Sequence, residues 1–426
     1  MRRSLRFSTL SVLSMLAGAV ISSPPAAAAA DWPQFRGPNS DNIVTAEKVP
    51  LVWSRTKNIA WRVDLPGKGW SSPVLSGGKL YLTTAVADGS DQDAQGARSL
   101  RAMSLDPATG KVLWDTEIFR EAANSPRIHD KNSHASPTPV AADGKLYVHF
   151  GHEGTACLDL EGKKIWEQRA LTYPPVHGGG PSPLLVDGLL IFPCDAAEGP
   201  FLAALHARDG TIAWKTPRTS GAKRNFSFCT PALITWEGQK QVISPASDAV
   251  AGYNPADGRE LWKVRYDGYS LICQPVFGNN LIYFSTGYDN AITYAVRPGG
   301  SGDVTEKNVA WTQPKRAPNT PSQILRGREL FQVADNGIAS CLDALTGEIL
   351  WQERTARTTS ASPLLIGDKL LIIDEFGTAT VLRAARTFEK IGENKLDGER
   401  VLATPVPDDG VLYVRTATGL YRIQEQ

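Results

Sequence analysis

The sequence predicts an all-β protein, an eight-bladed β-propeller of four-stranded blades, and three observations support that prediction. A turn with a glycine four residues before a tryptophan recurs along the chain, most completely in the stretch CLDALTGEILW at residues 341–351. A proline followed by a short apolar run recurs as a second marker. Residues 31–426 divided into eight repeats give about 50 residues per repeat, the size of one four-stranded blade.

The recurring turn joins two antiparallel strands and carries a tryptophan into the fold. Aspartate and threonine suit a tight turn, and the glycine can take a positive φ. A large flat side chain at a regular interval buries much area between stacked sheets. We therefore expect tryptophan-docked blades, with structural roles for Trp61, Trp114, Trp166, Trp214, Trp262, Trp311 and Trp351. Ile391 stands at the tryptophan position of the seventh repeat, so that blade should dock less firmly.

The second marker is a proline preceded mostly by small residues, and we place it on the innermost strand of each blade. An apolar run such as KLYL at residues 79–82 or VLYV at residues 411–414 follows it. The eight prolines are Pro73, Pro137, Pro183, Pro231, Pro275, Pro321, Pro363 and Pro405.

The order of the strands predicts how the ring closes. The last repeat ends one strand short, after residues 420–423, whereas residues 58–63 form an outermost strand that lacks its first three partners. We expect this N-terminal strand, which contains Trp61, to complete the last blade. Such pairing removes the free edge that an open sheet would present.

The chain divides into a leader, an arm and the propeller. Residues 1–30 combine a basic start, an apolar run from 10 to 21 and small residues before Asp31, which is typical of a secretory signal peptide. A membrane anchor is disfavoured because the run is short for a bilayer. Residues 31–56 should lie over the outside of the fold as an ordered arm, and residues 57–426 should form the propeller. We expect export to the periplasm or the extracellular space, by the general secretory or the twin-arginine route.

The composition of the chain narrows the classes of partner that it could bind. With 45 basic and 44 acidic residues the chain has no charge excess for binding nucleic acid or an anionic membrane, and we expect no integral membrane span. The register of the repeats separates the five cysteines, so we expect mostly buried free thiols. We expect a monomer.

The opening DWPQFRGP at residues 31–38, together with the LDxxTGxxxW repeats, resembles the exported pyrroloquinoline-quinone-like β-propeller repeat proteins of Planctomycetes. It resembles more distantly the propeller lipoprotein of the outer-membrane β-barrel assembly machinery and the quinoprotein dehydrogenases. The resemblance covers about residues 57–426 and implies the fold. Because one fold hosts many functions, it does not assign an activity.

The loops that precede the innermost strands are the place where we expect a binding site, at one mouth of the central channel. They differ among repeats whose framework is uniform, which is typical of binding loops on a rigid scaffold; plain solvated loops are the alternative. His134 and His177 could approach each other, but no third ligand follows at a telling spacing, so no metal site is expected. The candidate ligand-binding residues are Trp70, His134, His177, Arg224, Asn225, Tyr269, Asn319, Arg357 and Arg400.

Two functions follow from this pattern. The favoured one is a non-catalytic binding or scaffold protein for a protein, peptide or glycan of the cell envelope, without a cofactor. The alternative is a quinone-dependent or divergent oxidoreductase, for which the resemblance would imply pyrroloquinoline quinone, a calcium ion and an aspartate base. Asp374-Glu375 and Trp70 are the candidates for the base and the stacking floor. The chain lacks adjacent cysteines and a CxxCH haem motif, and its acidic loop at residues 88–93 favours a solvated hairpin over a calcium site.

Overall fold

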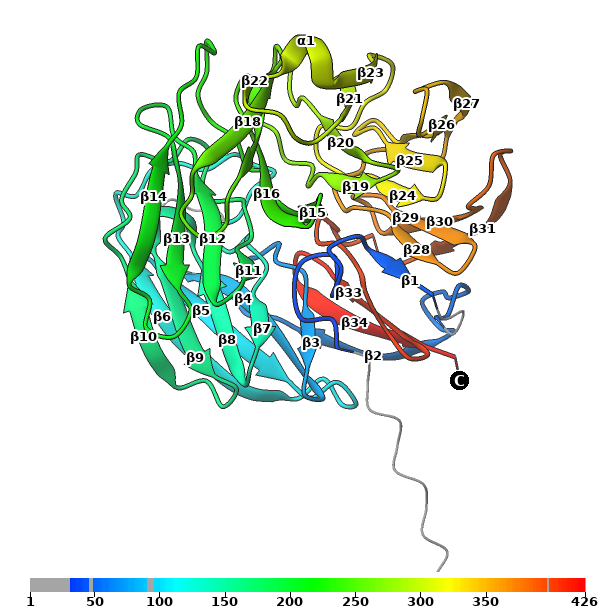
Figure 1. Ribbon diagram of the computed structural model, residues 1–426. Helices are drawn as coiled ribbons and strands as arrows, with labels where there is room; N and C mark the ends of the chain where they lie inside the picture. The colour runs from blue at the N-terminus through cyan, green and yellow to red at the C-terminus, as the bar shows by residue number, and fades with distance from the viewer. Residues whose placement is uncertain (1–30, 46–48, 90–95, 397, 426) are drawn as a thin grey trace, which may run out of the picture.

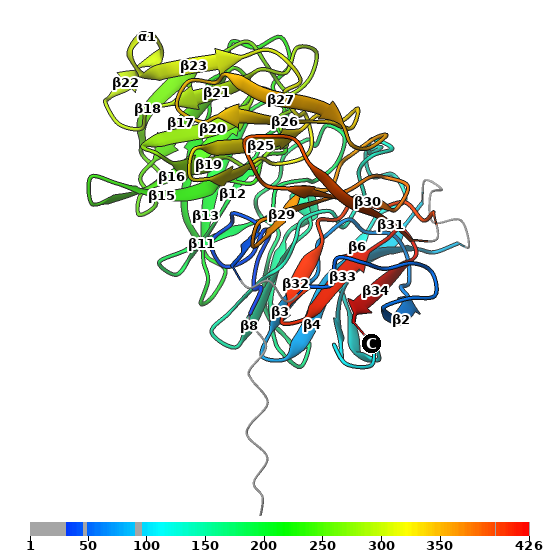
Figure 2. The same cartoon turned by 90° about the vertical axis from the view of Figure 1, so that its right-hand side faces the viewer.

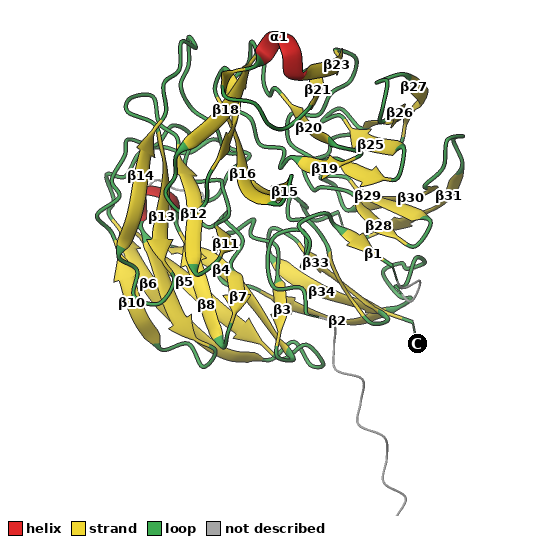
Figure 3. Cartoon of the chain, viewed as in Figure 1, coloured by secondary structure: helices red, strands yellow, loops and turns green. Residues whose placement is uncertain are grey.

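The computed structural model describes residues 31–45, 49–89, 96–396 and 398–425. The predicted signal peptide and most of the acidic loop at residues 88–93 lie outside the described residues. Eight sheets surround a central axis, and Figure 1 shows each of them as one blade. Figure 3 shows that strands and loops make up almost all of the described chain. The eight-bladed all-β propeller with four-stranded blades is therefore confirmed.

Blades 1 to 4 follow one another along the chain, each from its innermost to its outermost strand. They consist of β3 (Val74–Ser76), β4 (Lys79–Ala87), β5 (Arg98–Leu105) and β6 (Val112–Glu121); β7 (Val140–Ala142), β8 (Lys145–His149), β9 (Thr155–Asp159) and β10 (Lys164–Gln168); β11 (Leu184–Val186), β12 (Leu189–Cys194), β13 (Phe201–His206) and β14 (Ile212–Pro217); and β15 (Ala232–Trp236), β16 (Gln239–Ala246), β17 (Ala249–Tyr253) and β18 (Glu260–Arg265).

Blades 5 to 8 repeat the arrangement, and the last blade takes its outermost strand from the other end of the chain. They consist of β19 (Val276–Gly278), β20 (Leu281–Ser285), β21 (Thr293–Val296) and β23 (Val309–Gln313); β24 (Ile324–Arg326), β25 (Glu329–Val333), β26 (Ile338–Asp343) and β27 (Ile349–Arg354); β28 (Leu364–Ile366), β29 (Lys369–Ile373), β30 (Thr378–Arg383) and β31 (Lys390–Lys395); and β32 (Val406–Asp408), β33 (Val411–Arg415), β34 (Gly419–Gln424) and β2 (Ile59–Asp64).

Short elements complete the chain. Strand β1 (Ile43–Val44) adds to β28, and β22 (Gly302–Asp303) adds to β18, each in parallel. The helical segments among the described residues are η1 (Gly151–Glu153) and α1 (Thr305–Asn308). Within that part of the chain, neither has the length or the hydropathy to cross a membrane.

Strand β2 pairs antiparallel with β34, with Trp61 opposite Arg422. The indole of Trp61 donates a hydrogen bond of 3.2 Å to the carbonyl of Pro107, in the turn of blade 1. The equivalent tryptophans of most other blades donate to the matching turn of the next blade at 2.9–3.0 Å: Trp114 to Leu160, Trp166 to Ala207, Trp214 to Pro255, Trp311 to Ala344 and Trp351 to Ala385.

The turn glycine lies beneath the indole of the preceding blade. Gly347 has a φ of 75°, and a Cβ atom there would lie 2.6 Å from the ring of Trp311. Both the backbone and the space thus require glycine. Trp262 differs, because it is fully buried and its indole donates to Gln241 Oε1 within its own blade.

The register of the seventh repeat needs a correction. Val381 pairs with Gly392 where Cys341 pairs with Trp351, because the turn between β30 and β31 has one extra residue, so Gly392 and not Ile391 stands at the tryptophan position. Ile391, the residue before it, is 42% exposed.

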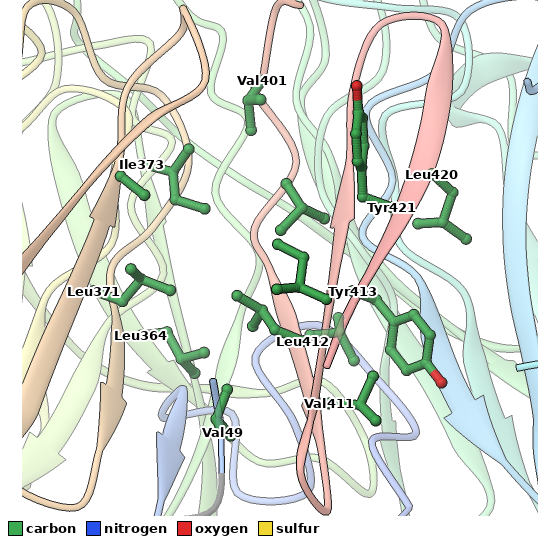
Figure 4. Close-up of a cluster of buried hydrophobic side chains, with 14 of the residues drawn as sticks. Val49, Leu364, Leu371, Ile373, Val401, Val411, Leu412, Tyr413, Leu420 and Tyr421 are labelled. Carbon is green, nitrogen blue, oxygen red and sulfur yellow. The ribbon is translucent and has the colours of Figure 1, made fainter. Parts of the chain in front are cut away.

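Apolar side chains fill the space between neighbouring blades. Figure 4 shows Leu371 and Ile373 of β29 facing Leu412 of β33, with Val49 at the edge of the same cluster. The blades stack face to face around the ring, as the turned view in Figure 2 shows. All five cysteines are buried and free, which confirms the prediction of free thiols.

The innermost strands correct the proline register in two repeats. A proline directly precedes the innermost strand in most blades, as Pro183 precedes β11. In blade 2 that position belongs to Pro139, two residues after Pro137, because β7 begins at Val140. In blade 6 it is Gln323 and not Pro321, because β24 begins at Ile324. The predictions for Pro137 and Pro321 were therefore wrong by two residues.

The prediction that the arm lies over the outside of the fold is wrong for residues 31–44, whereas Leu51 and Trp53 do contact Asn394 on β31, the outermost strand of blade 7. Trp32 bridges to Leu75 of blade 1, and the carbonyl of Pro33 accepts a hydrogen bond of 2.8 Å from the backbone of Ala141 in blade 2. The chain then reaches the other side of the ring, where β1 pairs with β28 of blade 7. Figure 1 shows β1 beside β28 near the centre of the ring. The arm therefore crosses the central channel.

Unpaired backbone on the innermost strands explains this path. The inner edge of each blade presents N–H and C=O groups that need partners when they are buried. The arm supplies such partners, and Arg36, fully buried, donates to the carbonyl of Gln323 in blade 6. Asn42 donates likewise to the carbonyl of Pro363 in blade 7. The pattern of prolines, glycines and aromatic residues in the arm predicts that it is ordered, but not what it pairs with.

Candidate binding site in the central channel

A cavity of about 480 Å³ occupies the channel at the mouth formed by the loops before the innermost strands, which we call the mouth loops. Phe35 of the arm belongs to its lining, so the cavity extends down to the segment that crosses the channel. Mouth loops of several blades contribute the rest of the lining, together with Tyr288 and Asp289 from the β20–β21 connection.

A belt of hydroxyl groups surrounds the cavity wall. In six of the junctions between blades, a backbone N–H at the start of one innermost strand donates to the hydroxyl of the next blade at 2.9–3.1 Å. The N–H of Ser182, for example, donates to Thr230 Oγ1. Because each hydroxyl accepts this bond, it keeps its own O–H for a ligand or for water. The belt consists of Thr138, Ser182, Thr230, Ser322, Ser362 and Thr404, all of which line the cavity.

Other side chains replace the belt at the two remaining junctions. Between blades 4 and 5, Gln274 Nε2 donates to the carbonyl of Pro231 at 3.0 Å. Between blades 8 and 1, the buried Arg415 donates to the carbonyl of Ser71 at 2.9 Å. The belt therefore runs around most of the channel and links neighbouring blades. The repeated tryptophans do not indicate which residues form these links.

An arc of rings forms one side of the mouth. His129, His177, Phe226 and Tyr269 come from four successive mouth loops, and each ring meets the next edge to face, with centroid distances of 5.5, 5.2 and 5.6 Å. His177 has a φ of 64°, and the Asn132 side chain holds its carbonyl at 2.8 Å. Burial, and then the charges of His129 and Arg224, lower the pKa of His177. His177 is therefore neutral at pH 7.

Charged groups bridge the opposite side of the mouth. Glu375, from the β29–β30 connection of blade 7, contacts Lys131 at 3.0 Å and Arg400 at 3.2 Å. Burial alone would raise the pKa of Glu375, but hydrogen bonds from Ser360 and Lys131 and the charges of Lys131 and Arg400 lower it. Glu375 is thus ionised and ties together loops of blades 2, 7 and 8.

The structure brings four of the predicted site residues together in the cavity lining. These are Trp70, His177, Arg224 and Tyr269. Arg224 Nη1 donates to the Tyr269 hydroxyl at 3.0 Å, and that hydroxyl donates to Asp289 at 2.8 Å. This chain of hydrogen bonds orients the guanidinium at the edge of the ring arc.

The other predicted residues lie elsewhere. His134 and Arg400 line a neighbouring cavity of about 370 Å³ beside blade 1. Asn225 lines a small hollow behind the mouth loop of blade 4. Asn319 donates its backbone N–H to Asp335 at 2.7 Å, and it is not part of the cavity lining.

Arg357 also lies outside the cavity lining, with its guanidinium 3.8 Å from the centroid of the Phe376 ring. The expected approach of His134 to His177 is wrong. His134 Nδ1 lies 2.9 Å from Glu121 Oε1 at the end of β6, while the ring next to His177 is that of His129. The long loop between β6 and β7 turns His134 toward blade 1, which spacing in the sequence does not reveal.

Sequence reasoning missed several lining residues, namely Phe35, His129, Lys131, Phe226, Tyr288 and Asp289. One available signal was the serine or threonine next to the marker proline, which forms the belt. Phe226 directly follows the candidates Arg224 and Asn225, and His129 precedes the candidate His134 by five residues in the same loop. Tyr288 and Asp289 come from the β20–β21 connection and not from a mouth loop. Only the folded ring brings this connection to the same mouth of the channel.

The lining does not fit a quinone held by calcium. Calcium takes six to eight oxygen ligands, including carboxylates, and Asp289 is the single carboxylate of the described lining. The candidate base is also engaged, because Asp374 Oδ1 accepts the backbone N–H groups of Phe376 and Thr378 at 2.9 Å. Trp70 does line the cavity.

Comparison with known proteins places this geometry among relatives. A family model described as outer membrane protein assembly factor BamB matches residues 98–353. The BamB protein of Shewanella oneidensis is 23% identical over 375 residues, which cover 83% of this chain and 87% of that protein. The BamB protein of Alkalilimnicola ehrlichii is 24% identical over 190 residues, and this match spans about half of that protein, 48%.

A polyvinylalcohol dehydrogenase of Pseudomonas sp. is 24% identical over 226 residues, covering 46% of this chain and 35% of that protein. Among solved structures, BamB from Moraxella catarrhalis has a TM-score of 0.56 at 12% identity, with 86% of this chain and 97% of that chain covered. A europium-containing methanol dehydrogenase has a TM-score of 0.52 at 10% identity, with 92% and 90% covered. At these identities the solved structures show the shared fold.

Proposed function

This chain belongs to the family of the outer membrane protein assembly factor BamB, and from that premise we propose that it is a non-catalytic binding or scaffold protein that holds a polypeptide partner at the mouth of its central channel. The arc of rings from four mouth loops is the observation that carries the proposal. The leader-like residues 1–30 and the relatives named as outer membrane assembly factors support a place in the cell envelope.

The chemistry of the mouth suits a polypeptide. Aromatic side chains and arginine dominate the binding energy of protein interfaces, since they bury large areas and form directed hydrogen bonds. Arg224 and Tyr269 stand together at the edge of the cavity. The cavity of about 480 Å³ suits one or a few partner side chains. The hydroxyl belt below would donate hydrogen bonds to the main chain or polar groups of that segment.

Matched arginine variants test the proposal. Arg224→Glu changes the cavity, whereas Arg357→Glu places the same charge change on a mouth loop outside it. A photoreactive benzoylphenylalanine at Tyr288, inside the cavity, would crosslink a bound protein from envelope extract. We expect Arg224→Glu to reduce crosslinking at least tenfold, with Arg357→Glu and the melting temperature almost unchanged, because exposed substitutions usually cost under about 0.5 kcal/mol.

Equal crosslinking in wild type and Arg224→Glu would overturn the proposal. A glycan ligand would instead give no protein adduct, and soluble cell-wall fragments would bind in calorimetry. That result would also overturn the proposal of a polypeptide partner.

A divergent oxidoreductase is the second candidate, because a polyvinylalcohol dehydrogenase is among the relatives. Pyrroloquinoline quinone with calcium should then raise the melting temperature of the purified protein, since a ligand that binds the native state stabilises it. An unchanged melting temperature at saturating quinone would remove this candidate.

A further inference from the structure

We propose that a second site, between blades 1 and 2 and outside the channel, binds a divalent transition-metal ion of the zinc class through Glu121, His152 and Glu153. One potential ligand atom from each of these residues lies within 4.8 Å of the other two. The site is independent of the proposed function, because none of the three residues lines the channel cavity.

Two neighbouring blades bring the three side chains together. Glu121 is the last residue of β6, the outermost strand of blade 1, and it is 1% exposed. His152 and Glu153 belong to η1, the short turn between β8 and β9 of blade 2. His152 Nε2 lies 3.5 Å from Glu153 Oε1, so these adjacent side chains face the same point. The ligands would thus bridge a junction between blades.

The imidazole of His152 lacks the partner that a buried ring needs. Its Nδ1 atom is fully buried and has no hydrogen-bond partner among the described residues. Its Nε2 atom is too far from Glu153 for a good hydrogen bond. Neither ring nitrogen is therefore committed to a good hydrogen bond, and an imidazole nitrogen is a common metal ligand.

The two carboxylates are held in place by other side chains, as metal-binding carboxylates usually are. His134 Nδ1 lies 2.7 Å from Glu121 Oε2 and 2.9 Å from Oε1, so it contacts both oxygens of this carboxylate. Arg169 Nη2 contacts Glu153 Oε2 at 2.9 Å, which leaves Oε1 on the side of His152. Arg98 Nε lies 4.0 Å from Glu121 Oε2.

The charge of these neighbours sets the expected affinity. Arg98 and Arg169 balance the two carboxylates, so an incoming ion must compete with them. Affinity should therefore fall below that of structural zinc sites whose thiolates have no such competitor.

The donor set selects the kind of ion. One imidazole nitrogen with two carboxylates suits zinc and its neighbours, which bind nitrogen and oxygen at about 2.0–2.2 Å. Tetrahedral ligands at those bond lengths stand roughly 3.4 Å apart, so the side chains must draw together on binding. Calcium prefers six to eight oxygen ligands and should not bind.

Calorimetry on the metal-free protein tests this site. Zinc chloride and calcium chloride are titrated separately into wild type, His152→Gln, Glu153→Gln and a control, His206→Gln. His206 is another partly buried histidine, at the end of β13 and away from the cluster. Cobalt(II) titration followed by visible absorption reports coordination directly, and circular dichroism checks that each variant is folded.

We expect one zinc ion per wild-type chain, no heat from calcium, and cobalt absorption bands that depend on His152. Zinc affinity should fall at least tenfold in His152→Gln and in Glu153→Gln and stay unchanged in His206→Gln. The proposal is overturned by wild type that binds no zinc, or by His152→Gln or Glu153→Gln that is folded and binds zinc as wild type does. If one of the two variants fails to fold, the other decides.

Discussion

Replacing Thr230 by valine isolates one bond of the hydroxyl belt. Thr230 Oγ1 accepts the backbone N–H of Ser182 at 3.0 Å, and both residues are buried. Valine keeps the volume but places a methyl group against that N–H, which loses its acceptor. An unsatisfied buried donor costs about 1–3 kcal/mol. Because the cavity admits water nearby, we expect the lower half of that range, about 1–2 kcal/mol.

Urea unfolding followed by tryptophan fluorescence measures this loss. Thr230→Ser keeps the hydroxyl and should lie close to wild type. Thr235→Val makes the same chemical change at an exposed position of β15 and should change the free energy of unfolding by under about 0.5 kcal/mol. If Thr230→Val is as stable as wild type, or if Thr230→Ser is equally destabilised, the belt does not contribute through its hydrogen bonds.

Three further predictions concern the frame of the propeller. Trp166→Ala should lower the free energy of unfolding by about 3 kcal/mol, and Ile391→Ala by under about 1 kcal/mol because Ile391 is 42% exposed; equal losses in urea melts would contradict the assigned register. Deleting residues 31–64 removes β2 and exposes the edge of β34, so light scattering should show aggregation. A deletion variant that stays monomeric and melts cooperatively would refute the role of β2 in closing the ring. Burial, and then the charge of His152, lower the pKa of His149 to about 3. As pH falls below about 6.5, this histidine takes up a proton in the unfolded chain but not in the folded one. The free energy of unfolding should therefore drop by about 2 kcal/mol between pH 7 and pH 5. A His149→Gln variant that loses as much over that interval would exclude this histidine as the cause.

The sequence by itself determined the frame of this protein. The turn at residues 341–351 is local chemistry, since aspartate, threonine and glycine specify the hairpin and tryptophan follows at a constant distance. Repetition of such a unit at a period of about 50 residues specifies a propeller before any contact is known. The absence of a tryptophan from the seventh repeat was visible for the same reason, but the extra turn residue that places Gly392 and not Ile391 at that position was not.

Only the tertiary structure decided what fills the channel and which side chains meet there. The arm pairs with innermost strands of blades 1, 2 and 7 because their inner edges have unpaired backbone groups, and no local pattern in residues 31–45 indicates those partners. Mouth loops of unequal length turn His177 into the cavity but His134 toward Glu121. Glu121 and His152 stand 31 positions apart and meet only because the edge of one blade lies beside a connection of the next. Contacts between blades set the positions of these side chains, and such contacts depend on the path of each loop and on the geometry of the ring. The repeated residues instead determine the structure within one blade and at its junction with the next.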